Sequence, residues 1–161
     1  PGVFARGAEE AQALRDAGLE YEVVPGVTAA SGAAAAVGGF LTERGKSDTL
    51  VLTTGRCAEG NGVPDWVTHL TQRSNIAVYM GVAAAPGISQ ALARAGLLDQ
   101  VDLTAVSKAQ HPDQKVLRCP ASDMVGAMER AGIESPAILF LSHRDAEISG
   151  AAHTVPQLVA V

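Results

Sequence analysis

The chain has 161 residues, of which 47% are hydrophobic, 18% charged and 4% aromatic, and its formal net charge is −5. This length suits one domain, or one domain with part of a second, and the apolar content is sufficient for a sizeable core. Nucleic-acid binding is disfavoured, because phosphate neutralisation requires clustered Lys and Arg, which this acidic chain lacks. Cys57 and Cys119 are far apart and form no C-x-x-C motif, which favours a reducing, cytoplasmic location over a disulfide scaffold.

The most apolar stretch, residues 28–41, is interrupted by Ser31, Gly32, Gly38 and Gly39, so we expect no membrane span. We also expect no secretory signal peptide. The chain begins at Pro1 without an initiator Met, and we expect it to be a piece of a longer protein.

Hydrophobic periodicity and helix-end signals predict alternating helices and strands in the first part of the chain. Glu9 and Glu10 stand in the first turn of the first helix, where they complement its dipole, and Gly18 ends it. Thr28 is the predicted N-cap of a second helix rich in small residues. The predicted elements are a helix at 8–17, a strand at 21–24, a helix from 28 to about 37 and a strand at 50–53.

The alternation continues in the second part of the chain. After a loop at 55–62, Pro64 suits the first position of a helix that carries Trp66 and Leu70. A turn around Pro112 separates two neighbouring strands, which predicts an antiparallel pair. The remaining predicted elements are a strand at 76–80, a helix at 88–95, strands at 103–107 and 115–118, a helix at 122–131 and a buried strand at 137–141.

Strands that alternate with helices of this length predict an α/β fold with parallel strand pairs. The antiparallel pair makes the predicted sheet mixed, with helices on both of its faces. We place a domain boundary in the polar segment 42–47. Residues 1–42 would then be the remnant of an N-terminal α/β domain, and residues 43–161 would form the C-terminal domain.

Several common sequence signatures are missing. The histidines have no metal-ligand spacing, so we expect no metal site and interpret each His as a surface or loop residue. The chain has no G-x-G-x-x-G fingerprint after a strand and no Walker loop. A nucleotide-dependent oxidoreductase would suit the α/β pattern, but the chain lacks the glycine fingerprint of that class, so this function is disfavoured.

The informative residues follow the predicted strands, where ligands bind in open α/β sheets. Residues 24–29 join a strand to a helix whose first N–H groups suit a carboxylate. Residues 78–81 end a strand with the flexible thioether of Met80 next to a glycine, and residues 107–110 follow another strand. Each feature alone is also compatible with ordinary turn chemistry or core packing.

A series of short motifs occurs in a fixed order along nearly the whole chain. These are R-G-A-E-E at 6–10, V-P-G-V-T-A-A at 24–30, L-T-E-R-G at 41–45, D-W at 65–66, V-Y-M-G at 78–81, Q-x-x-x-Q-K-V at 110–116 and S-P-A-I at 135–138. Their order and spacing resemble the tetrapyrrole methylase family, most closely its uroporphyrinogen-III C-methyltransferase branch. By this resemblance Pro1 ends the family's G-G-D-P motif, and we expect the chain to be truncated at its N-terminus.

The resemblance implies a class III methyltransferase fold, in which two α/β domains of a homodimeric enzyme hold S-adenosylmethionine between them. It assigns contacts with this cosubstrate to Pro1, Val3, Thr28, Ala29, Met80 and Ala109. It assigns the catalytic role, which includes the group that removes a proton, to Arg6 and Glu9, and substrate binding to Arg6, Arg44 and Met80. Guanidinium groups suit the carboxylates of uroporphyrinogen, which favours this role for Arg6 and Arg44; the structural alternative for Arg6 is a surface ion pair with Glu9 or Glu10.

The implied reaction is C-methylation of uroporphyrinogen III to precorrin-2, for siroheme or cobalamin synthesis. One alternative is methylation of another corrin or porphyrin intermediate. Another is a catalytically incompetent fragment that only folds and dimerises. The expected partners are a tetrapyrrole and a second copy of the chain, with no nucleic acid and no membrane.

Overall fold

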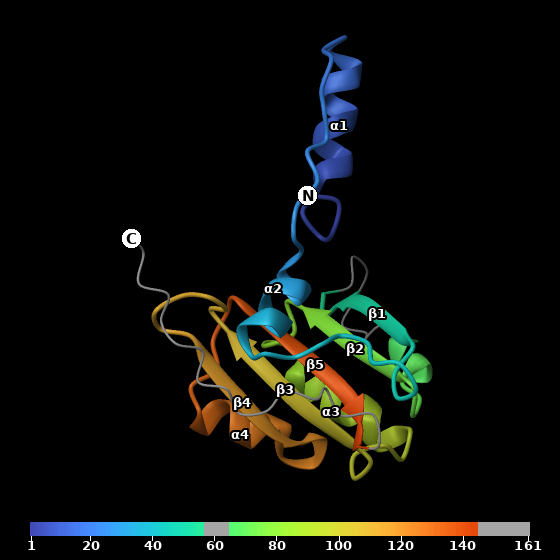
Figure 1. Cartoon of the computed structure of the whole chain (residues 1–161), viewed down its shortest axis with the longest axis vertical. Helices are drawn as coiled ribbons and strands as arrows, with labels where there is room; N and C mark the ends of the chain where they lie inside the picture. The colour runs from blue at the N-terminus through green and yellow to red at the C-terminus, as the bar shows by residue number, and fades with distance from the viewer. Residues whose placement is uncertain (57–64, 145–161) are drawn as a thin grey trace.

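A computed structural model describes residues 1–56 and 65–144, and its centre is one five-stranded sheet (Figure 1). The strand order is β1-β2-β5-β3-β4, in which β1 and β2 are parallel and every other neighbouring pair is antiparallel. This confirms the predicted mixed sheet. The strands are β1 (Thr49–Thr54), β2 (Ser74–Tyr79), β3 (Val101–Ser107), β4 (Lys115–Pro120) and β5 (Ala137–His143).

The helices of the described chain agree with the predicted positions except in one case. They are α1 (Gly7–Asp16), α2 (Ala29–Ala36), α3 (Ala85–Arg94) and α4 (Met124–Arg130), with 3₁₀ helices η1 (Asp65–His69) and η2 (Ala121–Asp123). The helix expected to carry Trp66 and Leu70 is the five-residue 3₁₀ helix η1, which ends at His69; Trp66 and Leu70 are both buried in the core. Pro64 and most of the predicted loop at 55–62 lie outside the described residues.

Alternate residues of each strand enter two separate cores, because successive side chains point to opposite faces of a sheet. On β2, Ile76 and Val78 join the core beneath α3, α4 and η1, here called the α3-side core. Ala77 and Tyr79 join the α2-side core, together with Phe140 of β5. The predicted presence of helices on both faces of the sheet is thus confirmed (Figure 1).

The α2 helix lies close against the sheet because its buried face consists of alanines. Ala30, Ala33 and Ala34 are at most 3% exposed and pack in the α2-side core. Side chains this small let the helix backbone approach the strands. Although α2 precedes the predicted domain boundary at residue 42, it covers the sheet formed by residues 49–143.

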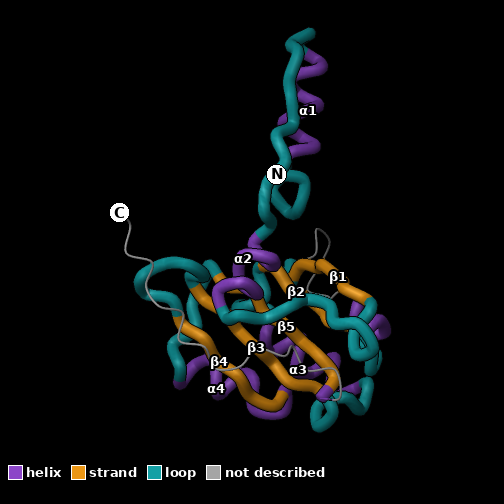
Figure 2. The backbone as a smooth tube through the Cα atoms, viewed as in Figure 1, coloured by secondary structure: helices purple, strands orange, loops and turns teal. Residues whose placement is uncertain are grey.

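The α1 helix projects away from the sheet, and the loop that follows runs back alongside it (Figure 2). None of its ten residues, all described, is buried. The predicted strand at 21–24 is wrong: residues 17–28 are described and form no strand, and Val23 is 62% exposed. Its apolar composition suits a strand, but a strand requires a neighbour to satisfy its backbone N–H and C=O groups.

Candidate functional site

An open pocket of about 1090 Å³ lies at one end of the central strands, beside the N-terminus of α2. Its walls come from the ends of β2 and β3, from the beginning of β5 and from the first turns of α2. β5 lies between β2 and β3 and is antiparallel to both. The carboxyl ends of β2 and β3 therefore lie at the same end of the sheet, next to the pocket. We call it the strand-end pocket; ligands commonly bind at this position in open α/β sheets.

The strand-end pocket brings together residues from three distant parts of the sequence. Thr28, Ala29, Met80 and Ala109, four of the residues expected to contact the cosubstrate, all line it. Val3, also expected there, packs instead at the border of the α2-side core, and Pro1 is exposed; the described lining includes neither. The turns after residues 27, 79 and 107 therefore converge as expected.

Non-glycine residues adopt left-handed backbone conformations in two of these turns. Met80 has φ +53° directly after β2, and Lys108 and Gln110 have φ +50° and +62° after β3. Such conformations are uncommon for residues with a side chain and tend to occur at functional sites. The Lys108 N–H donates to the Pro136 carbonyl at 2.8 Å, and Gln110 Nε2 donates to the Gly32 carbonyl at 3.2 Å. These bonds hold the turn after β3 against Pro136, which directly precedes β5, and against α2.

Tyr79, a pocket-lining residue that sequence reasoning missed, connects β2 to α2. Its hydroxyl accepts a hydrogen bond from the Ala30 N–H at 3.0 Å and also bonds to Thr28 Oγ1. Thr28 is the N-cap residue as predicted, but its side chain makes no capping bond and contacts Tyr79 instead. Tyr79 stands within the V-Y-M-G motif, and this position was its only signal in the sequence.

Charged groups at the rim of the strand-end pocket form a compact cluster. Asp113 accepts a hydrogen bond from Lys108 Nζ at 2.5 Å and pairs with His111 Nδ1. The Lys108 ammonium, and next the His111 contact, lower the pKa of Asp113 to about 2, while Asp113 raises the pKa of Lys108. Near neutral pH Asp113 is therefore a carboxylate and Lys108 an ammonium.

Arg6 and Glu9, the expected catalytic residues, form an exposed ion pair at the start of α1. The hydrogen bond and charge of Arg6 lower the pKa of Glu9, so this carboxyl group is ionised near neutral pH. The described lining of the strand-end pocket includes neither residue. The structure thus contains the surface pair that the sequence already allowed.

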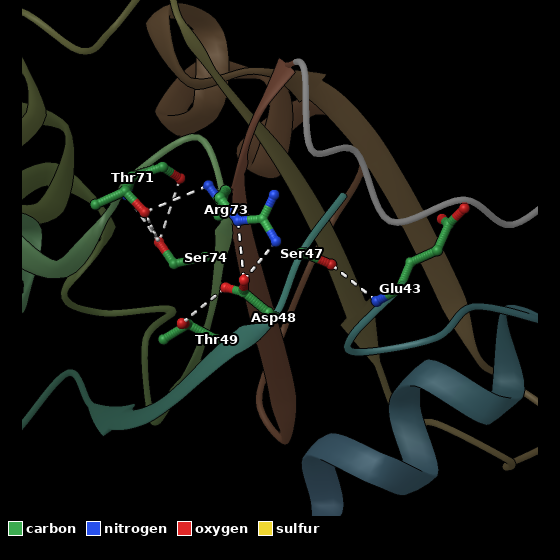
Figure 3. Close-up of polar contacts among 7 residues, drawn as sticks. All are labelled: Glu43, Ser47, Asp48, Thr49, Thr71, Arg73 and Ser74. Carbon is green, nitrogen blue, oxygen red and sulfur yellow. Dashed lines mark hydrogen bonds and ion pairs between the residues drawn. The ribbon is translucent and has the colours of Figure 1, made fainter. Parts of the chain in front are cut away.

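Arg44, expected to bind substrate, lies in the exposed turn between Glu43 and Ser47. Figure 3 shows the surroundings of this turn: the Glu43 N–H donates to Ser47 Oγ at 3.1 Å, and Asp48 pairs with Arg73, which directly precedes β2. The strand-end pocket lies at the other end of β2, and its described lining does not include Arg44. Arg44 is therefore not brought together with the pocket residues.

Within residues 1–56 and 65–144, no group of three or more His, Cys, Asp or Glu side chains is arranged to hold a metal ion. None of the helices there is long and apolar enough to cross a membrane.

Comparison with known proteins relates the chain to enzymes of tetrapyrrole metabolism. Siroheme synthase of Zymomonas mobilis is 39% identical over 142 residues, which are 88% of this chain and 30% of that protein. The chain thus spans about a third of the length of the curated relatives that it matches.

Solved structures with the same fold include two methyltransferases. Uroporphyrin-III C-methyltransferase of Thermus thermophilus, complexed with S-adenosylhomocysteine, is 30% identical with a TM-score of 0.72, over 88% of this chain and 59% of that one. A cobalt precorrin-4 methyltransferase is 28% identical with a TM-score of 0.72, over 86% and 58% of the two chains. Both likenesses support the expected class III methyltransferase fold.

A family-level match covers most of the sequence. Residues 1–125 match the Tetrapyrrole (Corrin/Porphyrin) Methylases. Together with the fold and the strand-end pocket, this match shows that the chain belongs to the tetrapyrrole methylase family.

Proposed function

We propose that the chain is part of an S-adenosylmethionine-dependent C-methyltransferase that converts uroporphyrinogen III to precorrin-2, as a cytoplasmic homodimer. The observation that carries this proposal is the convergence of Thr28, Ala29, Met80 and Ala109 on the strand-end pocket. The Thermus thermophilus neighbour was solved with S-adenosylhomocysteine, which supports S-adenosylmethionine as the methyl donor.

The residues of the strand-end pocket fit the parts of such a cosubstrate. Its alanines and Ile138 offer apolar contact to a nucleoside, and the first turn of α2 offers backbone N–H groups to a carboxylate. When bound, S-adenosylmethionine supplies a methyl group on a positively charged sulfur, which a pyrrole carbon attacks directly. The chain's contribution is to hold the reacting atoms in line, an effect that can be worth ~7–11 kcal/mol.

The acidic tetrapyrrole gives the cations of the chain a role. Arg6 and Arg44 are exposed and permanently charged, and a guanidinium pairs with a carboxylate through two hydrogen bonds. We assign both to substrate carboxylates, with Met80 contacting the macrocycle at the pocket. Glu9, ionised beside Arg6, is the proposed proton acceptor, although it is a weak base because its pKa is lowered.

A second candidate function is methylation of a later corrin intermediate. It is favoured by the cobalt precorrin-4 methyltransferase, whose TM-score equals that of the Thermus thermophilus enzyme. Quenching of the fluorescence of Trp66, the single tryptophan, separates the two candidates when uroporphyrin III and a cobalt corrin are added in turn. A lower concentration for half-maximal quenching by uroporphyrin III supports the first candidate, and a lower one for the cobalt corrin supports the second.

Cosubstrate binding is tested by calorimetry with S-adenosylhomocysteine. We expect micromolar affinity for the 161-residue chain, and at least a tenfold loss in Ala29→Leu, whose larger side chain would fill the pocket beside α2. Ala35→Leu is the matched control, because Ala35 is an exposed residue of the same helix that is not part of the described lining. Absence of binding by the parent chain, or equal losses in both variants, would contradict the proposal.

A further inference from the structure

We infer that Tyr79 is a positioning residue of the strand-end pocket, holding the first turn of α2 and the N-terminal segment in place for the cosubstrate. This inference rests on the proposed function and adds a residue to which the family resemblance assigned no role. Tyr79 is the last residue of β2, immediately before Met80, and it lines the pocket.

The Tyr79 hydroxyl joins the strand to the helix. It accepts a hydrogen bond from the Ala30 N–H at 3.0 Å and bonds to Thr28 Oγ1, although these partners are 49 and 51 residues away in the sequence. The first N–H groups of a helix have no partner within the helix itself. Tyr79 therefore satisfies one of these groups, and the bond fixes where the first turn of α2 lies relative to β2.

The Tyr79 ring contacts a third segment. Its centroid lies 4.9 Å from that of Phe4, with 50° between the ring planes, and neighbouring Val3 packs against the same core. Aromatic pairs at this centroid distance are favourable beyond the apolar area that they bury. One side chain thus connects residues 3–4, residues 28–30 and the Met80 turn.

The anchor itself is rigid, since all six residues of β2 are buried and the strand pairs with β1 on one side and β5 on the other. Tyr79 is 8% exposed. Removing only its hydroxyl would keep the ring and its Phe4 contact while releasing Thr28 and Ala30. The pocket would then have to order the first turn of α2 on binding, which weakens affinity.

The decisive variant is Tyr79→Phe, with Tyr21→Phe as its matched control, because Tyr21 is exposed outside the described pocket lining. Calorimetry with S-adenosylhomocysteine is carried out at a temperature where denaturant titration shows every variant to be folded. We expect Tyr79→Phe to bind about three- to tenfold more weakly, the range for loss of one hydrogen bond, and Tyr21→Phe to bind like the parent. Amide hydrogen exchange at Ala30 should be faster in Tyr79→Phe, a local readout that loss of overall stability would not confine to this residue.

The outcomes separate this inference from the proposed function. If the parent binds and Tyr79→Phe binds equally well, the positioning role is overturned and the proposed function stands. If the parent does not bind S-adenosylhomocysteine, the proposed function fails and the positioning role fails with it. Should Tyr79→Phe not fold, Thr28→Val removes the same hydroxyl contact from the α2 side, and unchanged affinity in that variant overturns the role of the contact.

Discussion

At the rim of the strand-end pocket, Asp113 is held between Lys108 and His111, and this arrangement gives the residue a defined effect on stability. Its pKa in the folded chain is lowered from 3.8 to about 2, mainly by the hydrogen bond from Lys108. A carboxyl group with a lowered pKa stabilises the folded state above its ordinary pKa, and this contribution disappears as the pH falls through the folded-state value. The relevant window is therefore pH 3.8 to about 2.

Replacing Asp113 with Asn should make the free energy of unfolding less dependent on pH within that window. The amide cannot titrate, so the variant has no proton to gain when it unfolds in acid. Denaturant titrations at several pH values measure the slope for parent and variant. Asp99→Asn, at an exposed position after α3, is the control, and a D113N slope equal to that of the parent would contradict the assignment.

At the scale of elements, α2 shows how small residues set the distance between a helix and a sheet. Ala33 is fully buried against the α2-side core and also lines the strand-end pocket, whereas Ala35, two residues later, is exposed. The closeness of the helix to the strands is thus a property of its alanine face. The same closeness lets the Tyr79 hydroxyl reach the first turn of α2.

Ala33→Leu should destabilise the fold by about 1–3 kcal/mol, the usual range for overpacking a well-filled core. The larger side chain must push α2 away from β2 and β5. Ala35→Leu makes the same chemical change at the exposed face and should alter the free energy of unfolding by less than about 0.5 kcal/mol. Equal effects of the two substitutions in thermal or denaturant unfolding would show that α2 is not packed as described.

For the molecule as a whole, stability is distributed unevenly between the sheet and the N-terminal arm. β2 is buried along its whole length, whereas none of the ten described residues of α1 is buried. Isolated helices shorter than about 12–15 residues are marginal in water. The α1 helix therefore depends on local contacts such as the Arg6–Glu9 pair, which is exposed to solvent.

Hydrogen exchange should reveal this difference directly. Amides of α1 should exchange at rates close to those of an unstructured peptide, because opening this helix exposes almost no buried surface. Amides of β2 and β5 should exchange only through opening of the sheet. Protection of α1 equal to that of β2 in the isolated chain would indicate a packing partner for the helix, contrary to the described structure.

Sequence reasoning predicted the elements whose signals are local. The apolar runs of β2 and β5 and the N-cap at Thr28 were found where the structure has them. The strand expected at 21–24 was wrong, because strand formation depends on a neighbour that local sequence does not reveal. Tyr79 was missed since its partners are some 50 residues distant, and the separation of Arg44 from the pocket depends on which end of β2 its turn adjoins.

The position of β5 determines when the sheet can be completed while the chain is being synthesised. This strand is the last of the five in sequence but lies third in the sheet, between β2 and β3. On a ribosome, β2 and β3 would emerge long before residues 137–143 arrive to join them. Until then each has an unpaired edge that exposes it to aggregation, so the nascent polypeptide can complete its sheet only after nearly all of residues 1–143 have been translated.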